Sequence, residues 1–309
     1  MTALATPSSV AGREQSRARY PDATGIIERD GVRVFWERYG EGKGDGRPAI
    51  LFAPTWSIVH SRIWKSQVPD FARRHRVLTV DPRGNGRSDR PTSAAAYSEQ
   101  AFAADLMAVM DASGTERAVI VSLSLGAQRS MIAAAEHPER VAGLVFLGPA
   151  VPLGEGLPER KVSFDDRLVT DRGWAKYNRH FWRRDYDAFV EWFFGRCLTE
   201  PHSTKQTEDA VSWGLETDAE TLILTNDSTR LSPDQIRAIC ARLDTPTLVI
   251  QGDADAVTGP GRGVALADAI PGARLLTIAG GGHLPNARDP VLVNLAIRAF
   301  VRDLPVVSR

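Results

Sequence analysis

Three side chains in this sequence could together activate a serine nucleophile: Ser124, Asp255 and His283, in that order along the chain. A serine hydroxyl is a weak nucleophile near neutral pH, so it needs an imidazole to take its proton and a carboxylate to orient that imidazole. We therefore predict that Ser124 is the nucleophile, His283 the base and Asp255 the acid. Asp253, two residues earlier, competes with Asp255 for the acid position.

The residues around Ser124 predict the sharp turn that lifts a nucleophile above a sheet. An apolar run rich in β-branched residues begins at Ala118, as in a strand buried on both faces, and a helical pattern follows it. The motif for such a turn is G-x-S-x-G; here Ser122 replaces the first glycine, and Gly126 is the last. Both positions must be small because strand and helix approach closely. The alternative interpretation is a small-residue turn with a surface serine.

Length and composition limit what else the chain can be. At 309 residues it can bury a large core, and 38 basic residues balance 38 acidic ones, so no overall positive charge favours a nucleic-acid backbone. Residues 1–23 indicate a flexible tail without an export signal, and no segment has the roughly 18 apolar residues that a membrane span needs. Cys197 and Cys240 lack metal-ligand spacing, which favours a cytoplasmic protein without a disulfide scaffold.

Outside one interruption, strand patterns alternate with helix patterns along the chain. Such alternation predicts an α/β fold with a mostly parallel eight-stranded sheet and helices on both faces. Sites in these sheets lie at the carboxyl ends of the strands, and each of the three candidate residues follows a predicted strand. Strands are expected at 24–28, 32–39, 49–53, 76–80, 141–147, 247–251 and 273–278 and in the run from Ala118; helices are expected at 61–71, 99–112, 261–270 and 289–304 and after Ser124.

The interruption predicts a helical cap. Aromatic residues between Trp174 and Phe194 stand at spacings of three and four, a pattern too irregular for a sheet and too aromatic for a linker. We expect a tail at 1–23, a core of 24–149 and 234–309, and a cap insertion at 150–233. Basic residues among the aromatics could stack on nucleic-acid bases, but their acidic neighbours favour a solvated face of ion pairs. The basic residues are Arg172, Lys176, Arg179, Arg183 and Arg184, and the acidic ones are Asp171, Asp185, Asp187 and Glu191.

With these motifs in this order, the sequence resembles the α/β-hydrolase fold family over nearly the whole chain. The resemblance rests on the turn around Ser124, the glycine-rich turn from Asp81 to Ser88, the segment from Gly252 to Asp255 and the pair Gly282-His283. It implies the roles of nucleophile, acid and base given above, and its spacing after the strand-end glycine selects the later of the two aspartates. It also implies a cap after the sixth strand, an esterase-like or lactonase-like activity, and no metal or organic cofactor.

The largest departure from that family is the loop after the third predicted strand. The family carries His-Gly there, and a backbone N–H of this loop helps to hold the substrate's oxyanion; here the loop reads Pro54-Thr55-Trp56-Ser57. We expect the N–H of Leu125 and that of Trp56 or Ser57 to form the oxyanion hole. Among the other histidines, His60 is the strongest candidate for a role because it follows this loop. Side chains expected to line the substrate pocket are Trp56, Leu123, Trp182 and Leu284.

The predicted reaction is hydrolysis of a carboxylic ester or lactone through an acyl-enzyme. An aromatic cap favours a small and mostly apolar substrate, and neither a nucleic acid nor a membrane is an expected partner. Carbon–carbon bond hydrolysis, acyl transfer and perhydrolysis use the same three residues and stay open as alternatives. A ligand receptor that keeps the fold without useful turnover is the alternative from another class, and the oligomeric state is left open.

Overall fold

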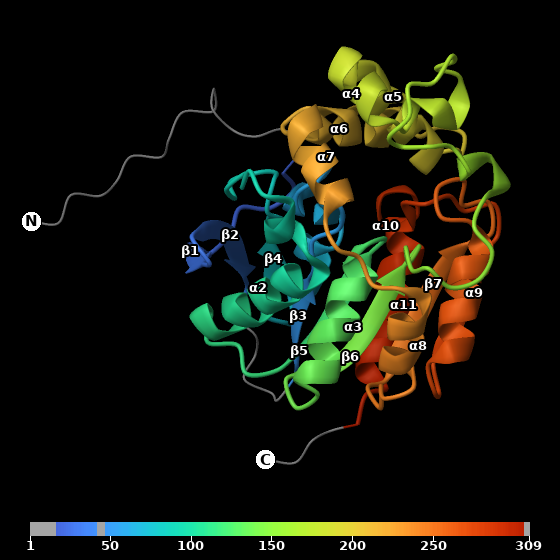
Figure 1. Ribbon diagram of the computed structural model, residues 1–309. Helices are drawn as coiled ribbons and strands as arrows, with labels where there is room; N and C mark the ends of the chain where they lie inside the picture. Colours follow the sequence, from blue (N-terminus) through green and yellow to red (C-terminus); the bar gives the residue numbers. More distant parts are fainter. Residues whose placement is uncertain (1–16, 42–46, 306–309) are drawn as a thin grey trace, which may run out of the picture.

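The computed structural model describes residues 17–41 and 47–305, in which eight strands form one sheet (Figure 1). The strand order is β1-β2-β4-β3-β5-β6-β7-β8. β2 is antiparallel to both of its neighbours, and the other pairs are parallel, so the predicted fold class is confirmed. The strands are β1 (Ala23–Arg29), β2 (Val32–Tyr39), β3 (Ala49–Phe52), β4 (Val77–Val80), β5 (Ala118–Leu123), β6 (Val141–Leu147), β7 (Thr247–Gly252) and β8 (Arg274–Ile278).

The central strands bury both of their faces. All six residues of β5 are buried, which explains why its sequence is an unbroken apolar run ending in a serine and a leucine. Because side chains alternate along a strand, Val119 and Val121 belong to one apolar cluster, and Ala118 and Ile120 belong to the cluster on the other face. Two separate cores therefore hold the sheet from its two sides.

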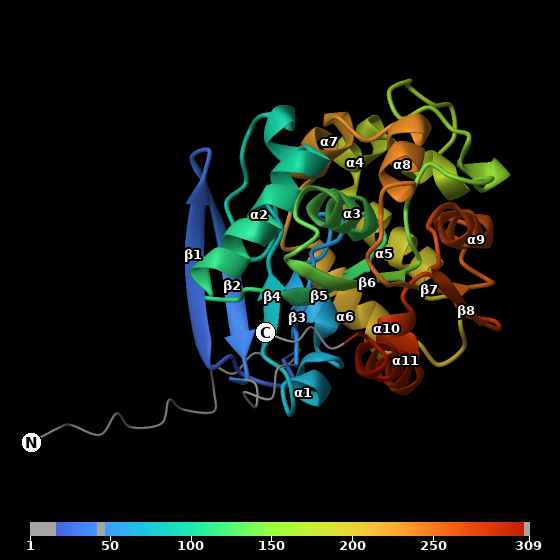
Figure 2. The same ribbon diagram turned by 90° about the horizontal axis from the view of Figure 1, so that it is seen from below.

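Helices cover these two faces (Figure 2). α2, α3, α8 and α9 contribute apolar side chains to the cluster that contains Ile120, and α1 and α11 contribute to the cluster that contains Val121. The sheet is thus the middle of three layers. The helices are α1 (Val68–Phe71), α2 (Glu99–Ala112), α3 (Gly126–Glu136), α8 (Pro233–Cys240), α9 (Pro260–Ala269) and α11 (Pro290–Arg302).

Four further helices lie together beyond the carboxyl ends of the parallel strands (Figure 1). Loops that follow the strands touch them there. Trp56 Nε1 donates to Thr225 Oγ1 at 2.7 Å, and the His283 N–H donates to the Cys197 carbonyl at 3.0 Å. These helices are α4 (Arg179–Arg184), α5 (Tyr186–Cys197), α6 (Thr204–Gly214) and α7 (Ala219–Asp227).

Three of the five basic side chains named above, Arg179, Arg183 and Arg184, form ion pairs with acidic side chains, and some of these partners lie far from them in sequence. Arg184 pairs with Asp171 at 3.0 Å, and Arg183 pairs with Glu220 of α7 at 2.7 Å. These contacts agree with a solvated face of ion pairs. The sequence pattern could not supply Glu220, because it lies on a different helix.

Two stretches near the site differ from the predicted elements. The helix expected at 61–71 is two short pieces, the 3-10 helix η2 (Ser61–Trp64) and α1, which begins afresh with Pro69 in its first turn. A short α10 (Pro285–Arg288) follows His283 and was not predicted. Most of the expected flexible tail, 1–16, lies outside the described residues, but Arg17 is held on β2 by an ion pair with Glu37 at 2.9 Å.

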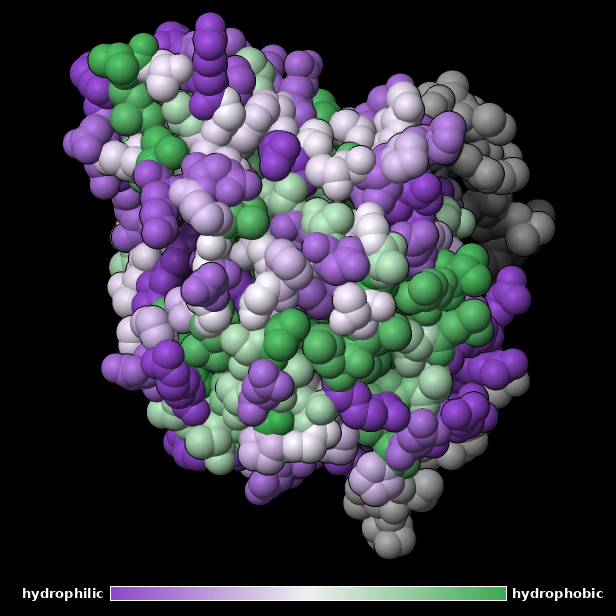
Figure 3. Space-filling model, turned by 90° about the vertical axis from the view of Figure 1, so that its right-hand side faces the viewer, coloured by the Kyte–Doolittle hydropathy of each residue, from purple (hydrophilic) through white to green (hydrophobic). Residues whose placement is uncertain are grey.

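The described surface mixes apolar and charged side chains. Figure 3 views the side of the molecule on which α9 and β8 lie and shows apolar groups between polar ones. In the ranges 17–41 and 47–305, no helix is long and apolar enough to cross a membrane, and no His, Cys, Asp and Glu side chains gather in a group that could hold a metal ion. Cys197 and Cys240 are buried free thiols. Exposed large apolar side chains on α9, β8 and α11 are Val264, Leu275, Val291, Leu292 and Leu295.

Candidate active site

Ser124 occupies a strained turn between β5 and α3. Its φ is 54°, a left-handed conformation that residues other than glycine rarely adopt. Two hydrogen bonds hold the turn: the Ser124 N–H donates to the Leu147 carbonyl at 2.9 Å, and the Ala150 N–H donates to the Ser124 carbonyl at 3.0 Å. Strain of this kind persists only where the surroundings fix it, and it is frequent at functional sites. The sharp turn that the motif predicts is present.

The two small positions around Ser124 are not equally restricted. A Cβ on Gly126 would lie 2.8 Å from the Pro54 carbonyl oxygen and 3.1 Å from the Ser122 Cβ, so a side chain fits there only if the loop moves. Ser122 is fully buried, and its Cβ fills the space beside Gly126. Serine is therefore tolerated at the first position because glycine is kept at the last.

His283 and Asp255 form a buried hydrogen-bonded pair. His283 Nδ1 lies 2.9 Å from Asp255 Oδ2, and the two side chains are 4% and 0% exposed. Asp255 also accepts hydrogen bonds from the backbone N–H groups of Val257 and Thr258 and from the Thr258 hydroxyl. Asp253 is exposed and accepts from a backbone N–H instead. Of the two candidate aspartates, only Asp255 contacts the histidine.

Asp255 is held in its charged form. Burial by itself would raise the pKa of this carboxyl, but the charge of the His283 imidazole and hydrogen bonds from His283 and Thr258 outweigh burial and keep the pKa well below its ordinary value. A carboxylate that is charged at neutral pH can orient an imidazole and stabilise its protonated form. Since Nδ1 of His283 is bound to Asp255, Nε2 is the ring nitrogen that remains to accept a proton.

Gly148, the first residue after β6, joins the serine turn to the histidine pair. A Cβ on Gly148 would lie 3.1 Å from His283 Nδ1 and 3.4 Å from Asp255 Oδ2. The residue before it, Leu147, binds the Ser124 N–H. The structure thus brings Ser124, His283 and Asp255 to the carboxyl end of β6. The sequence prediction missed Gly148, and the only signal for it was a glycine directly after a strand.

The loop after β3 lies against the same turn, through the contact of Pro54 with Gly126. Leu125 is the N-cap residue of α3, so its N–H stands where a helix leaves backbone donors without internal partners. Trp56 is buried with its indole bound to Thr225, and the Ser57 hydroxyl donates to the Arg83 carbonyl at 2.7 Å.

The side chains expected to line the pocket all belong to one apolar cluster: Trp56, Leu123, Trp182 and Leu284. Aromatic rings dominate it. The Trp56 ring centroid lies 5.7 Å from that of Trp182 and 5.5 Å from that of Phe193, and Trp182 is 4.6 Å from Phe189. The predicted helical spacing grouped these aromatic residues, but it could not show which of them face Trp56.

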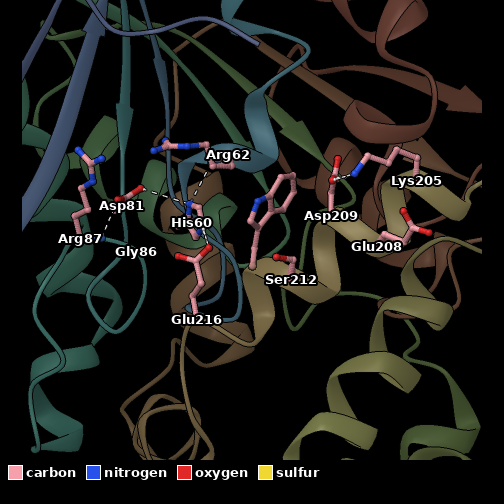
Figure 4. Close-up of a pocket in the computed structure, with 11 residues that line it drawn as sticks. His60, Arg62, Asp81, Gly86, Arg87, Lys205, Glu208, Asp209, Ser212 and Glu216 are labelled. Atoms are coloured by element: carbon pink, nitrogen blue, oxygen red, sulfur yellow. Dashed lines mark hydrogen bonds and ion pairs between the residues drawn. The ribbon is translucent and has the colours of Figure 1, made fainter. Parts of the chain in front are cut away.

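A polar cavity of about 510 Å³ lies between α6 and the loops that follow β3 and β4, and Trp213 of the apolar cluster forms part of its lining (Figure 4). In it, His60 Nε2 is 3.2 Å from Glu216 Oε1, and His60 Nδ1 is 3.9 Å from Asp81 Oδ1. Neither Ser124 nor the His283 pair lines it. His60 therefore belongs to the contact between the core and α6, and the structure does not bring it to the serine turn.

Comparison with known proteins identifies the family. A family model described as "alpha/beta hydrolase fold" matches residues 48–290. The chain therefore belongs to the α/β hydrolase fold family, as the sequence resemblance implied. Among solved structures, Est816, described as an N-acyl homoserine lactone degrading enzyme, superposes with a TM-score of 0.71 at 28% identity, covering 89% of this chain and 100% of that one.

Two curated relatives are esterases by name. A rhodomycin D methylesterase of Streptomyces sp. strain C5 is 28% identical over 85% of this chain and 93% of that protein. A pimeloyl-[acyl-carrier protein] methyl ester esterase of Edwardsiella ictaluri is 26% identical over 83% of this chain and 93% of that protein. The predicted class, a hydrolase that acts on ester bonds, is confirmed.

Proposed function

We propose that this protein is a serine hydrolase that cleaves a carboxylic ester or lactone through an acyl-enzyme. One observation carries the proposal: the strained Ser124 turn and the hydrogen-bonded His283–Asp255 pair both lie against the chain at Leu147 and Gly148. The esterase and lactone-degrading relatives support an ester-type substrate.

In the proposed reaction, His283 Nε2 accepts the hydroxyl proton of Ser124 while Oγ attacks the substrate carbonyl carbon. The carbonyl oxygen becomes an oxyanion, which accepts hydrogen bonds from the N–H of Leu125 and from that of Trp56 or Ser57. The tetrahedral intermediate collapses to an acyl-serine, and the protonated His283 gives its proton to the departing alkoxide. Water deprotonated by His283 then releases the acid and restores Ser124.

The aromatic residues around Trp56 support a small, mostly apolar substrate. In this proposal residues 150–233 form a cap over the site, and 24–149 and 234–309 form the core. A zero formal net charge supports a small-molecule partner over a nucleic acid. Two free thiols support a cytoplasmic location.

The test is turnover of p-nitrophenyl esters together with labelling by a fluorophosphonate probe. We expect the wild-type protein to do both and Ser124→Ala to do neither. Ser130→Ala is the matched control. Ser130 lies on α3, the helix that follows Ser124; its side chain is fully buried and donates to the Gly126 carbonyl, and it has no role in the proposed reaction. A wild-type protein that binds ester analogues without label or turnover would favour the receptor alternative.

The acceptor alternatives are separated by their products. In the first experiment, water, an alcohol and peroxide compete for the acyl group, and the product distinguishes a hydrolase from an acyltransferase or a perhydrolase. In the second, a vinylogous diketone serves as the substrate and tests carbon–carbon bond cleavage. We expect the free acid to be the dominant product at every accessible alcohol concentration, and a dominant ester product would contradict the proposed reaction.

A further inference from the structure

One buried arginine holds the loop after β3 from the side of α3. Arg129 Nη1 donates to two successive carbonyl groups of this loop, that of Pro54 at 3.2 Å and that of Thr55. Arg129 is 2% exposed and lies one helical turn beyond Gly126, the residue against which Pro54 packs. The unusual loop that replaces the family's His-Gly is thus tied to the helix that begins just after Ser124.

A held carbonyl also fixes the direction of an N–H. In a trans peptide the C=O of one residue and the N–H of the next point to opposite sides, and the structure has no cis peptide bond in the residues that it describes. With the Thr55 carbonyl bound to Arg129, the Trp56 N–H points away from Arg129. The Ser57 N–H shares its peptide with the Trp56 carbonyl, which accepts from the Val59 N–H within the loop, so Arg129 does not orient it.

We infer that Arg129 is a positioning residue for the oxyanion hole, and that the N–H which it aims at the substrate oxygen is that of Trp56 rather than that of Ser57. This inference rests on the proposed serine hydrolase function and names one of the donors that it requires. Arg129 touches no reacting atom and acts through the loop alone.

The guanidinium group is itself fixed by α2. Arg129 Nε donates to Glu99 Oε2 at 2.9 Å, and its Cζ lies 3.5 Å from the centre of the Phe102 ring. A planar guanidinium can bond a carboxylate with one nitrogen and two carbonyls with another while its face rests on a ring. The single ammonium of lysine cannot reach all of these partners at once. A Lys substitution therefore keeps the charge but loosens the loop.

The experiment compares Arg129→Met and Arg129→Lys with the wild-type protein on a p-nitrophenyl ester. A misaimed oxyanion donor weakens the transition state more than substrate binding, and loss of one donor costs about a hundredfold to a thousandfold in kcat. We expect kcat to fall about 10- to 100-fold in Arg129→Met and less in Arg129→Lys, with KM changed by less than about threefold. Affinity for a trifluoromethyl ketone, whose adduct with Ser124 carries an oxyanion, should fall by the same factor as kcat.

Arg17→Met is the matched control. Arg17 is also a buried arginine, with a side chain 4% exposed and an ion pair to Glu37, but it binds β2. Each substitution leaves the glutamate that loses its partner with a second arginine nearby. In Arg17→Met, Glu37 keeps Arg62 at 3.1 Å, and in Arg129→Met, Glu99 keeps Arg230 at 3.9 Å. Arg17→Met should lose comparable stability and keep its kcat.

Two results would overturn the inference. In the first, Arg129→Lys, and Arg129→Met if that variant folds, have the same kcat and the same affinity for the ketone as Arg17→Met. Arg129 then only stabilises the fold. If the wild-type protein shows neither ester turnover nor fluorophosphonate labelling, the proposed function fails and this inference fails with it. Ester turnover in the wild type separates the two cases.

Discussion

Gly126, two residues after Ser124, leaves room for the loop after β3 to pack against the serine turn. We predict that Gly126→Ala destabilises the protein by about 1–3 kcal/mol and lowers kcat, since the new methyl group would push on the Pro54 carbonyl, 2.8 Å away. Gly195→Ala is the control: Gly195 lies within α5 with open space around its Cα, so alanine should be neutral or stabilise by up to about 1 kcal/mol. Urea unfolding and ester turnover measure both. Equal effects of the two substitutions would contradict the tight contact.

Thr258 donates to Asp255 Oδ2 at 2.7 Å and helps to lower the pKa of that carboxyl. A carboxyl with a lowered pKa stabilises the folded state at pH values above its unfolded pKa, and this stabilisation is lost as the pH falls toward the folded pKa. We therefore expect Thr258→Val to cost about 1–3 kcal/mol at pH 7 and less as the pH falls below about 4. Urea unfolding across pH measures this, with the exposed Thr277 of β8 replaced by valine as control. A cost that does not change with pH would contradict the coupling.

At the residue scale, the types and order of the site residues were predictable, but some contacts were not. Ser124 and His283 follow strands with clear patterns, whereas the choice between Asp253 and Asp255 depends on how the loop after β7 turns. The contacts of Arg129 with Pro54 and Thr55 join segments about 75 residues apart in the chain, and no local pattern encodes such a contact.

At the element scale, the end of α5 reaches the loop that carries His283. The Cys197 carbonyl accepts from the His283 N–H at 3.0 Å, and Glu200 Oε1 accepts from the Gly282 N–H at 2.6 Å. Removing Glu200 should let this loop shift, so we predict that Glu200→Ala lowers kcat about tenfold. Glu200→Gln keeps an acceptor oxygen and should stay near the wild-type value. Ester kinetics of the two variants decide the matter: equal rates in both would show that the contact has no effect on His283.

Elements with a strong pattern and clear end signals were predicted closely. α2 spans Glu99–Ala112 and β6 spans Val141–Leu147, as the sequence indicated. The stretch at 61–71 carried a helical pattern but folds as two short pieces, because local propensity is weak compared with the tertiary contacts of a loop that must also pass the site. Where the helices between 179 and 227 lie relative to the sheet depends on contacts between distant residues, which periodicity alone does not contain.

At the scale of the whole molecule, helices α4 and α5 and one face of the sheet share a single apolar cluster. Trp182 and Phe189 belong to it together with Val121 and Ile250. Because this cluster crosses the predicted boundary between cap and core, we expect the two parts to unfold together. Tryptophan fluorescence and far-UV circular dichroism should give coincident urea transitions. An earlier transition by fluorescence would contradict this, since four of the seven tryptophans lie between residues 174 and 213.

The proposed mechanism requires that Ser124 carries the acyl group of the substrate. The most direct measurement is peptide mass spectrometry after acid quenching of the protein during turnover of a p-nitrophenyl ester. We predict an acyl adduct on the peptide that contains Ser124 in the wild-type protein, and none in Ser124→Ala. Turnover that leaves Ser124 unmodified, or an adduct on another residue, would contradict the proposed mechanism.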